Sequence, residues 1–190
     1  MKKVITSVGT SIFINYLQGC KDIEDHWCTI EKKRHREWDN CKDRIDRIRK
    51  PVTDWARNNE DASAEIKSLF KLLQKEKDDL DIFLLATDTV LSRLAAEIIK
   101  EVLVEQEGLT VYFNPQIDVI QGLQVQDYVE FMETGTQKFI KRIMEIAGGY
   151  FENVIFNISG GYKGLAPFMT IMAQVNSCDI IYIFEESEAL

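Results

Sequence analysis

Two glycine-containing turns hold the residues whose types and spacing are best suited to chemistry. Residues 6–11 read Thr-Ser-Val-Gly-Thr-Ser, and residues 157–164 read Asn-Ile-Ser-Gly-Gly-Tyr-Lys-Gly. Each turn follows an apolar run of strand length and precedes a helical pattern. At the carboxyl edge of a parallel sheet, the N–H groups of such turns and the start of the next helix attract anions. The two turns therefore predict one phosphate-bearing ligand that is held from both sides.

The second turn is the more specific of the two. It places the hydroxyl of Ser159 and the cation of Lys163 among three glycines just after a buried strand, where cations are seldom needed for packing. Gly9 alone would fit a tight strand-to-helix turn equally well. The turn is not a Walker A loop, because Leu165 follows where the magnesium ligand would be, and Gly-x-Gly-x-x-Gly is absent. An unrelated Rossmann-like mononucleotide- or dinucleotide-binding enzyme is the alternative function.

The elements that must position these turns alternate along the chain. Continuous apolar strands separated by amphipathic helices indicate a parallel sheet covered on both faces. The sequence therefore predicts a doubly wound, mainly parallel, Rossmann-like α/β fold in a single domain, with the ligand beyond the carboxyl ends of the strands. Strands are predicted at 3–8, 80–86, 109–113, 154–158 and 180–184, and helices at 60–77, 90–105, 127–147 and 165–176.

Residues 21–60 depart from this alternation and predict a charged helical insertion. They hold 11 Lys or Arg against 10 Asp or Glu. Arg34 interrupts a heptad-like apolar stripe there, and Pro51 is expected to kink or end a helix. Such a stripe usually docks on the core, whereas its tryptophans are also typical of a subunit interface or a cover over the ligand site. The stripe consists of Trp27, Trp38, Cys41, Ile45, Ile48, Val52 and Trp55.

Composition narrows the classes of function. The chain has 190 residues with 45% hydrophobic content, enough for a sizeable core. Its apolar runs are far shorter than the roughly 20 residues of a membrane span, so we expect a cytoplasmic protein with no membrane partner. A net charge of −8 argues against broad binding of duplex nucleic acid. Because no disulfide framework or zinc spacing is present, we expect no metal and no cofactor; the residues considered are Cys20, His26, Cys28, His35, Cys41 and Cys178.

Four segments in order along the chain resemble a known family. They are Val-Gly-Thr-Ser at 8–11, Ala-Thr-Asp-Thr at 86–89 with Arg-Leu-Ala-Ala-Glu at 93–97, Ile-Gln-Gly-Leu-Gln at 120–124, and Ser-Gly-Gly-Tyr-Lys at 159–163. Together they resemble a CARF domain, the CRISPR-associated Rossmann fold, and most closely the type III accessory proteins that sense cyclic oligoadenylate. The resemblance covers most of the chain, and residues 21–60 are its least typical part.

The resemblance implies a homodimer whose strand-end turns surround a shared cleft for cyclic tetra-adenylate or cyclic hexa-adenylate, as the sensor of type III CRISPR antiviral signalling. Matching two-fold symmetry explains why each subunit needs only half a site. The ring size stays open, because many relatives carry a Thr and an acidic residue where this chain has Ser159 and Gly164. The ligand-binding residues carried over are Gly9, Thr10, Ser11, Thr87, Asp88, Thr89, Gln121, Gly122, Ser159, Gly160, Gly161, Tyr162 and Lys163.

Some members of this family are ring nucleases, which use the ribose 2′-hydroxyl of the ligand as nucleophile without a metal. Carried over by position, Lys163 would stabilise the developing charge and Ser11 would position the hydroxyl, as the two catalytic residues. Neither turn contains a histidine, so cleavage would be slow, and the sequence leaves open whether the ring is cleaved or only sensed.

In most relatives the sensing domain drives an effector domain. The chain carries no effector motif and ends just after its last predicted strand, which favours an excised N-terminal sensory domain over a standalone protein.

Overall fold

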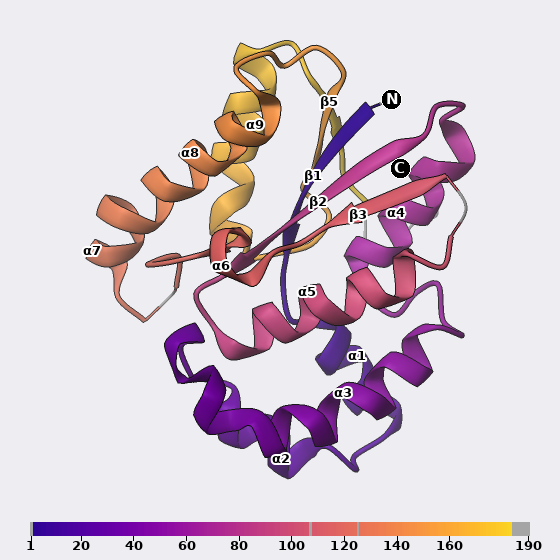
Figure 1. Ribbon diagram of the computed structural model, residues 1–190, viewed down its shortest axis with the longest axis vertical. Coiled ribbons are helices and arrows are strands. Elements are labelled where there is room, and N and C mark those ends of the chain that lie inside the picture. The colour runs from indigo at the N-terminus through magenta and orange to yellow at the C-terminus, as the bar shows by residue number, and fades with distance from the viewer. Residues whose placement is uncertain (1, 107, 125, 184–190) are drawn as a thin grey trace.

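A single parallel sheet forms the centre of the protein. The computed structural model describes residues 2–183 except residues 107 and 125. Within them the strands run in the order β3-β2-β1-β5-β6, with the short β4 beside β2, and every pair is parallel (Figure 1). This confirms the predicted mainly parallel α/β fold. The strands are β1 (Lys2–Val8), β2 (Leu80–Thr87), β3 (Leu109–Tyr112), β4 (Val119–Ile120), β5 (Val154–Asn157) and β6 (Asp179–Ile181).

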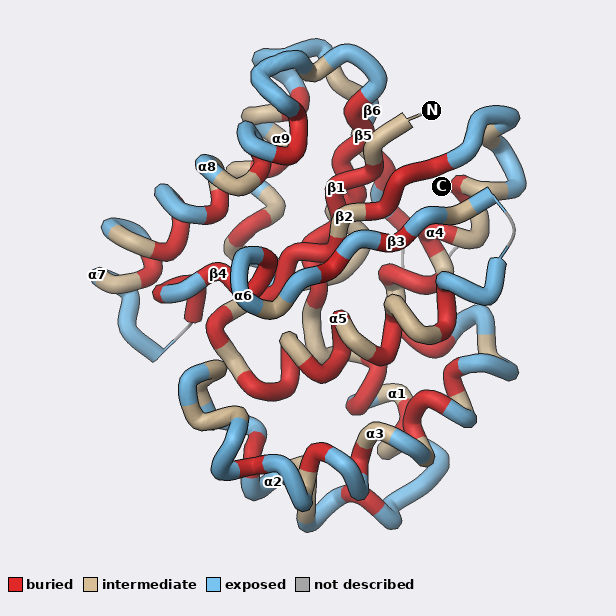
Figure 2. The backbone as a smooth tube through the Cα atoms, in the orientation of Figure 1, coloured by how far each residue is buried: buried red, intermediate tan, exposed pale blue. Residues whose placement is uncertain are grey.

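Helices cover both faces of the sheet, as predicted for a doubly wound fold. Successive strand residues point to opposite faces, so Val4 packs with the helices of one face and Ile5 with those of the other. The central strands β1, β2 and β5 are accordingly almost fully buried, whereas the edge strands β3 and β6 are partly exposed (Figure 2). One face carries α1 (Ser11–Gly19), α4 (Ala64–Lys75) and α5 (Val90–Leu103), and the other carries α8 (Thr136–Ala147) and α9 (Ala166–Val175).

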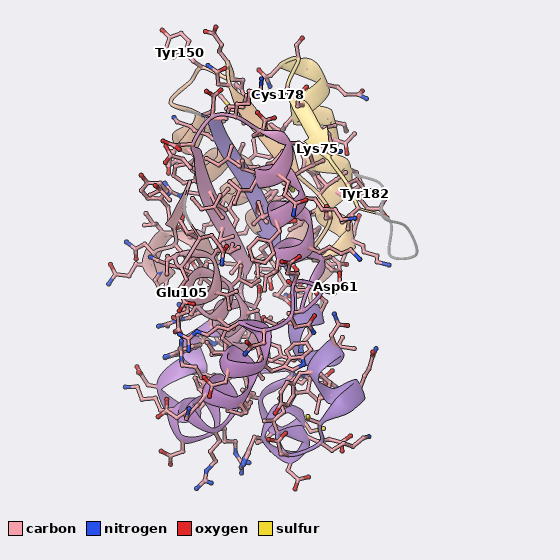
Figure 3. All side chains as sticks on the ribbon, turned by 90° about the vertical axis from the view of Figure 1, so that its right-hand side faces the viewer. Asp61, Lys75, Glu105, Tyr150, Cys178 and Tyr182 are labelled. Atoms are coloured by element: carbon pink, nitrogen blue, oxygen red, sulfur yellow. The ribbon has the colours of Figure 1, made fainter. Side chains whose placement is uncertain are left out.

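The charged insertion packs on the outer side of α5, at the bottom of the view in Figures 1 and 3. It consists of α2 (Glu24–Ile30), the 3-10 helix η1 (His35–Cys41) and α3 (Lys42–Ala56). Ile45, Ile48 and Val52 are buried in the core, which confirms that the apolar stripe docks there. Pro51 lies inside α3 and does not end it, because the buried side chains on both sides of it hold the two halves against the core.

The predicted helix at 127–147 is confirmed as one unbroken helical run over 128–147, in which three stretches differ in their hydrogen-bond pattern. They are α7 (Tyr128–Glu130), the π-helical turn η2 (Phe131–Gly135) and α8. The turn brings Gly135 against Gly122, so closely that a Cβ on Gly135 would lie 2.6 Å from the Gly122 oxygen. A further short helix, α6 (Pro115–Asp118), lies between β3 and β4. The predicted strand end at residue 184 lies outside the described residues.

The strand order creates a switch point between β1 and β5. After β1 the chain continues to β2 and β3 on one side, and it returns to place β5 and β6 on the other. In open α/β sheets, ligands bind beyond the carboxyl ends of the strands at such a point. The two glycine turns follow these two strands. Among the described residues, no helix combines the length and apolar character needed to cross a bilayer.

Candidate functional site

The two glycine turns touch each other at the switch point. A Cβ on Gly9 would lie 3.1 Å from the Cα of Gly161, and the Ser7 hydroxyl donates to the Gly160 oxygen at 3.0 Å. Gly161 has φ +86°, and a Cβ there would overlap the side chain of Ser7. Packing of one turn on the other therefore already requires Gly161, before any ligand is considered.

A buried carboxylate lies between the turns. Glu65 is 1% exposed, and its Oε1 accepts hydrogen bonds from the N–H groups of Gly9 at 2.8 Å and Gly161 at 3.0 Å. Its Oε2 accepts a bond from the hydroxyl of Ser11 at 3.4 Å. A Cβ on Gly160 would overlap this carboxyl group. Two of the N–H groups predicted to hold a phosphate thus already bind an anion of the chain itself.

A polar network holds Glu65 in place. Ser63 caps α4 by accepting from the Ile66 N–H at 3.2 Å, which fixes the first turn of the helix around Glu65. The hydroxyl of Ser68 donates to the main-chain carbonyl oxygen of Glu65, and the side-chain amide of buried Asn157 at the end of β5 donates to the Ser68 hydroxyl. The sequence analysis missed Glu65. The sequence signal that could have identified it is an acidic residue on the core-facing stripe of the predicted helix at 60–77.

Two pockets open on either side of the contact between the turns. The first has a volume of about 530 Å³ and the second about 490 Å³. Gly9, Thr10, Ile14, Gly161 and Lys163 border both of them. The first is completed by Ser11, Ala64, Ile158, Ser159, Gly160, Ala166, Tyr182 and Ile183, and the second by Val8, Trp27, Glu31, Thr87, Leu91, Thr89, Gln124 and Tyr162. Tyr182 lies at the β6 edge of the molecule (Figure 3).

The junction of the pockets offers unused hydrogen-bond donors. Helix α1 starts there without a side-chain cap from Thr10, and within the described residues no acceptor is found for the N–H groups of Thr10 and Ser11. Lys163 is exposed, and no described residue forms an ion pair with its ammonium group. Uncapped N–H groups at a helix start together with a lysine favour a negatively charged ligand.

The residues that follow β2 have different roles. Thr87 and Thr89 border the second pocket, and Thr89 also caps α5 by accepting from the Ser92 N–H at 3.1 Å. Asp88 borders neither pocket. Its buried Oδ2 accepts from the Gly122 N–H at 3.0 Å and from Arg34 at 2.5 Å. Asp88 therefore fixes the wall of the site, whereas base or ribose contacts were predicted for it.

Arg34 links three distant segments around that wall. Besides Asp88, its guanidinium donates two bonds to Glu130 of α7, at 2.9 and 2.8 Å. These bonds lower the pKa of the Glu130 carboxyl, and both carboxylates raise the pKa of Arg34. Sequence reasoning saw Arg34 only as a break in an apolar stripe. Arg34 ties the insertion to the wall of the second pocket, and Trp27 of the insertion borders that pocket.

The segment at 120–124 contributes one residue to a pocket. Gln121 accepts a hydrogen bond from Lys138 at 2.7 Å on the surface, and Gly122 has φ +83° beneath η2. Neither borders the two pockets, whereas Gln124, which is 5% exposed, borders the second. In the other turn, Ser159 borders the first pocket and its hydroxyl accepts from the Ile183 N–H at 3.0 Å.

An aromatic wall closes the second pocket. The ring of Tyr162 meets that of Phe131 edge to face, with centroids 5.5 Å apart. A Cβ on Gly164 would lie 2.5 Å from the Tyr162 ring, so this glycine is required for the ring to take its place. A smaller hollow of about 260 Å³ continues beyond Tyr162 towards α7. Such rings provide faces on which a planar base can stack.

Behind the site, His35 makes stability depend on pH. Burial, and then the positive charge of Arg93, lowers the pKa of its imidazole from about 6.5, against the opposing effect of Asp88 and Glu97. Its buried Nδ1 has no hydrogen-bond partner among the described residues. Because the unfolded chain binds this proton more tightly, stability is highest above the unfolded pKa and falls as the pH drops towards the folded one.

We therefore expect Tm to fall between about pH 7.5 and about pH 5.5, and to fall less in His35→Gln. Thermal melts of both proteins at the two pH values measure the difference. Carboxylates that titrate in this range are present in both proteins, so their contribution to the fall in Tm cancels in the comparison. An equal fall in the two proteins would contradict the assignment to His35.

One comparison with known families bears on this site. Residues 60–190 match the sequence model of the CRISPR-associated protein family Cas_APE2256. The matched region includes Glu65, the segment at 86–89 and the whole second turn, but not the first turn or the insertion. The match spans more than half of the sequence, and the chain therefore belongs to the Cas_APE2256 family of CRISPR-associated proteins.

Proposed function

We propose that this CRISPR-associated protein is a sensor that binds cyclic oligoadenylate, with cyclic tetra-adenylate as the first candidate, in the two pockets around the contact of the glycine turns. The observation that carries the proposal is the junction of the pockets, where Lys163 and the uncapped start of α1 offer positive charge at the switch point of the sheet. Membership of a CRISPR-associated family makes a CRISPR signalling nucleotide the natural anion to test.

The pockets suit alternating phosphate and base groups. Each volume lies in the usual range for small-molecule sites, about 300–1,000 Å³. The shared border carries Lys163 and Thr10 for phosphates or riboses, whereas Trp27 and Tyr162 add aromatic surface in the second pocket for adenine. A ligand of several nucleotides can reach both pockets at once, and a mononucleotide cannot use both equally well.

A dimer would complete the site. Ile14 and Tyr182 border the first pocket and are 50% and 45% exposed. Large apolar side chains at the rim of a polar pocket are typical of a surface that another protein covers. A second copy related by two-fold symmetry would place its own turns across a ring of matching symmetry.

We expect calorimetric titration with cyclic tetra-adenylate to give a Kd in the nanomolar to micromolar range, with one ring per two chains. This range corresponds to a binding free energy between about −8 and −12 kcal/mol. Light scattering in the same buffer should show a dimer. Linear tetra-adenylate is the matched control and should bind more weakly. A stoichiometry of one ring per chain, or equal affinity for the linear form, would overturn the proposal, and a preference for NAD or a mononucleotide would favour the alternative enzyme.

We further propose slow cleavage of the bound ring. Ser11 donates its proton to Glu65, so its oxygen is free to accept a hydrogen bond from a ribose 2′-hydroxyl in the first pocket. Lys163 borders the same pocket and supplies the charge that an attacked phosphate requires. The chemistry then needs mainly in-line positioning, because the nucleophile belongs to the ligand.

A further inference from the structure

Glu65 occupies a site built for an anion. N–H groups from two turns, Gly9 and Gly161, converge on one carboxylate oxygen at 2.8 and 3.0 Å, and the Ser11 hydroxyl meets the other. Burying a carboxylate is costly unless donors satisfy it, and here the donors come from segments 56 and 96 residues away. The arrangement is therefore a backbone anion site whose anion is supplied by the chain.

The carboxylate cannot easily leave this position. The backbone of Glu65 is fixed by Ser68, which in turn is held by Asn157 of β5. The Cα of Gly160 packs directly on the carboxyl group, where a side chain would overlap it. Glu65 itself borders neither pocket, but its carboxylate lies directly behind Gly9, Gly161 and Ser11 in the wall of the first pocket. A phosphate at this wall would consequently lie close to a fixed negative charge, and the two best-placed N–H groups would already be taken.

We propose that Glu65 is a specificity-determining residue, whose carboxylate fills the backbone anion site between the turns and so excludes free phosphate and mononucleotides. A ligand is accepted only if it gains enough from Lys163 and the start of α1, in both pockets together, to overcome this repulsion. The exclusion of small anions stands on the geometry of Glu65 alone. The identity of the larger ligand that is accepted rests on the proposed function.

The first test is chemical rescue of Glu65→Ala. Removing the side chain leaves two buried N–H donors without an acceptor, so the variant should melt at a lower temperature than the wild type. Formate is small enough to replace the lost carboxylate, and it should raise the Tm of the variant in a saturable way. The wild-type Tm should not respond in this manner, since its site is filled. A formate response that is no larger than that of the wild type would overturn the proposal.

The second test uses Glu65→Gln, which keeps an acceptor oxygen for both N–H groups but removes the charge. Inorganic phosphate and AMP should bind this variant about tenfold more tightly than they bind the wild type. Glu145→Gln on α8 removes the same charge from an exposed residue that pairs with Arg142 and makes no contact with the glycine turns, and it should leave both affinities unchanged. Because Glu65→Gln preserves the two backbone hydrogen bonds, it decides the question even if Glu65→Ala does not fold.

The outcomes separate this inference from the proposed function. If the wild type fails to bind cyclic tetra-adenylate while Glu65→Gln gains phosphate affinity, the ligand is wrong and the role of Glu65 stands. If Glu65→Gln binds phosphate and AMP no better than the wild type and Glu145→Gln, the role of Glu65 is refuted, whatever the cyclic ligand does.

Discussion

Replacing Arg34 by alanine is expected to destabilise the folded protein by about 3 kcal/mol and to lower its Tm by roughly 6–12 °C. The side chain of Asp88 is 7% exposed and pairs with Arg34 at 2.5 Å. Without the guanidinium, this carboxylate would stay buried, and among the described residues only the Gly122 N–H would remain as its hydrogen-bond partner. Removing one member of a buried ion pair costs more than the pair contributes, because the remaining charge stays uncompensated.

A control variant shows how much of this effect comes simply from removing one positive charge. Arg57→Ala removes an exposed arginine that pairs with Asp54 and Glu105 on the surface, and it should leave Tm unchanged within roughly 2 °C. Arg34→Lys should recover only part of the loss, since an ammonium cannot reproduce the two-pronged contact with Glu130. Thermal and urea unfolding give the values. A change in Arg34→Ala no larger than that in Arg57→Ala would show that the linkage is not important for stability.

The loss of Arg34 should also weaken ligand binding. The same side chain ties the insertion, the turn after β2 and α7 together. The insertion and the turn border the second pocket through Trp27 and Thr89, and Glu130 of α7 accepts a hydrogen bond from Gln124, which also borders that pocket. Binding measured below the melting temperature of the variant should therefore be weaker, although Arg34 itself borders neither pocket.

The fold could be predicted largely because its signals are local. Parallel strands buried on both faces appear as continuous apolar runs, such as residues 80–86, and a stripe such as that of α5 appears at helical spacing. Pro51 was expected to kink or end a helix; it does not end α3, in which the buried side chains of Ile48 and Val52 lie on either side of it. The helix at 127–147 was predicted with nearly its observed bounds, but the π-helical turn within it has no local signal in the sequence, and it lies where Gly135 packs against Gly122.

The site was only partly predictable for the same reason. The turns at Gly9 and at Gly160–Gly161 are local motifs, and the structure brings them together. The partner of their N–H groups, Glu65, belongs to another helix, and no local pattern shows where its carboxylate points. Asp88 has the residue type of a ligand contact, yet its carboxylate pairs with Arg34 from the insertion and borders neither pocket. Contacts between residues far apart in the sequence determine which partners such side chains have, and a local pattern does not show them.

The glycines of the second turn now have two explanations that sequence reasoning could not separate. Gly160 and Gly161 were attributed to the approach of a phosphate. Glu65 and Ser7 occupy the space in which their side chains would lie, so packing alone accounts for both. Mutating these glycines would therefore report on folding as much as on binding. Lys163 is the better probe of the ligand, since no described residue forms an ion pair with it.

Lys163→Ala is expected to weaken binding of cyclic tetra-adenylate by about 1.5–3 kcal/mol, roughly 10- to 150-fold. The ammonium group borders both pockets, and a charge-assisted hydrogen bond to a phosphate is lost with it. Lys50→Ala is the matched control, because Lys50 is an 82% exposed lysine of α3 that borders neither pocket. Titration calorimetry of the two variants gives the comparison. Equal affinities in folded variants would mean that Lys163 is a solvated surface residue.

The same substitution is expected to abolish cleavage. In the wild type, the 2′-oxygen of a ribose attacks the adjacent phosphorus, the bond from phosphorus to the 5′-oxygen breaks, and a 2′,3′-cyclic phosphate is left. The 2′-hydroxyl gives up its proton and the 5′-oxygen takes one up, so the step is balanced without any other reactant. Lys163 would stabilise the negative charge that grows on the phosphate oxygens, an interaction that is strongest in the transition state.

Incubation of the wild type with excess cyclic tetra-adenylate in EDTA should therefore give slow formation of linear products with 2′,3′-cyclic phosphate ends. Ser11→Ala should slow this reaction more than it weakens binding, because a group that orients the attacking hydroxyl acts chiefly in the transition state. Chromatography of the products over several hours measures both effects. An intact ring would leave a sensor without nuclease activity, and a strict requirement for magnesium or manganese would contradict the mechanism, since Lys163 would then not be the group that carries the charge.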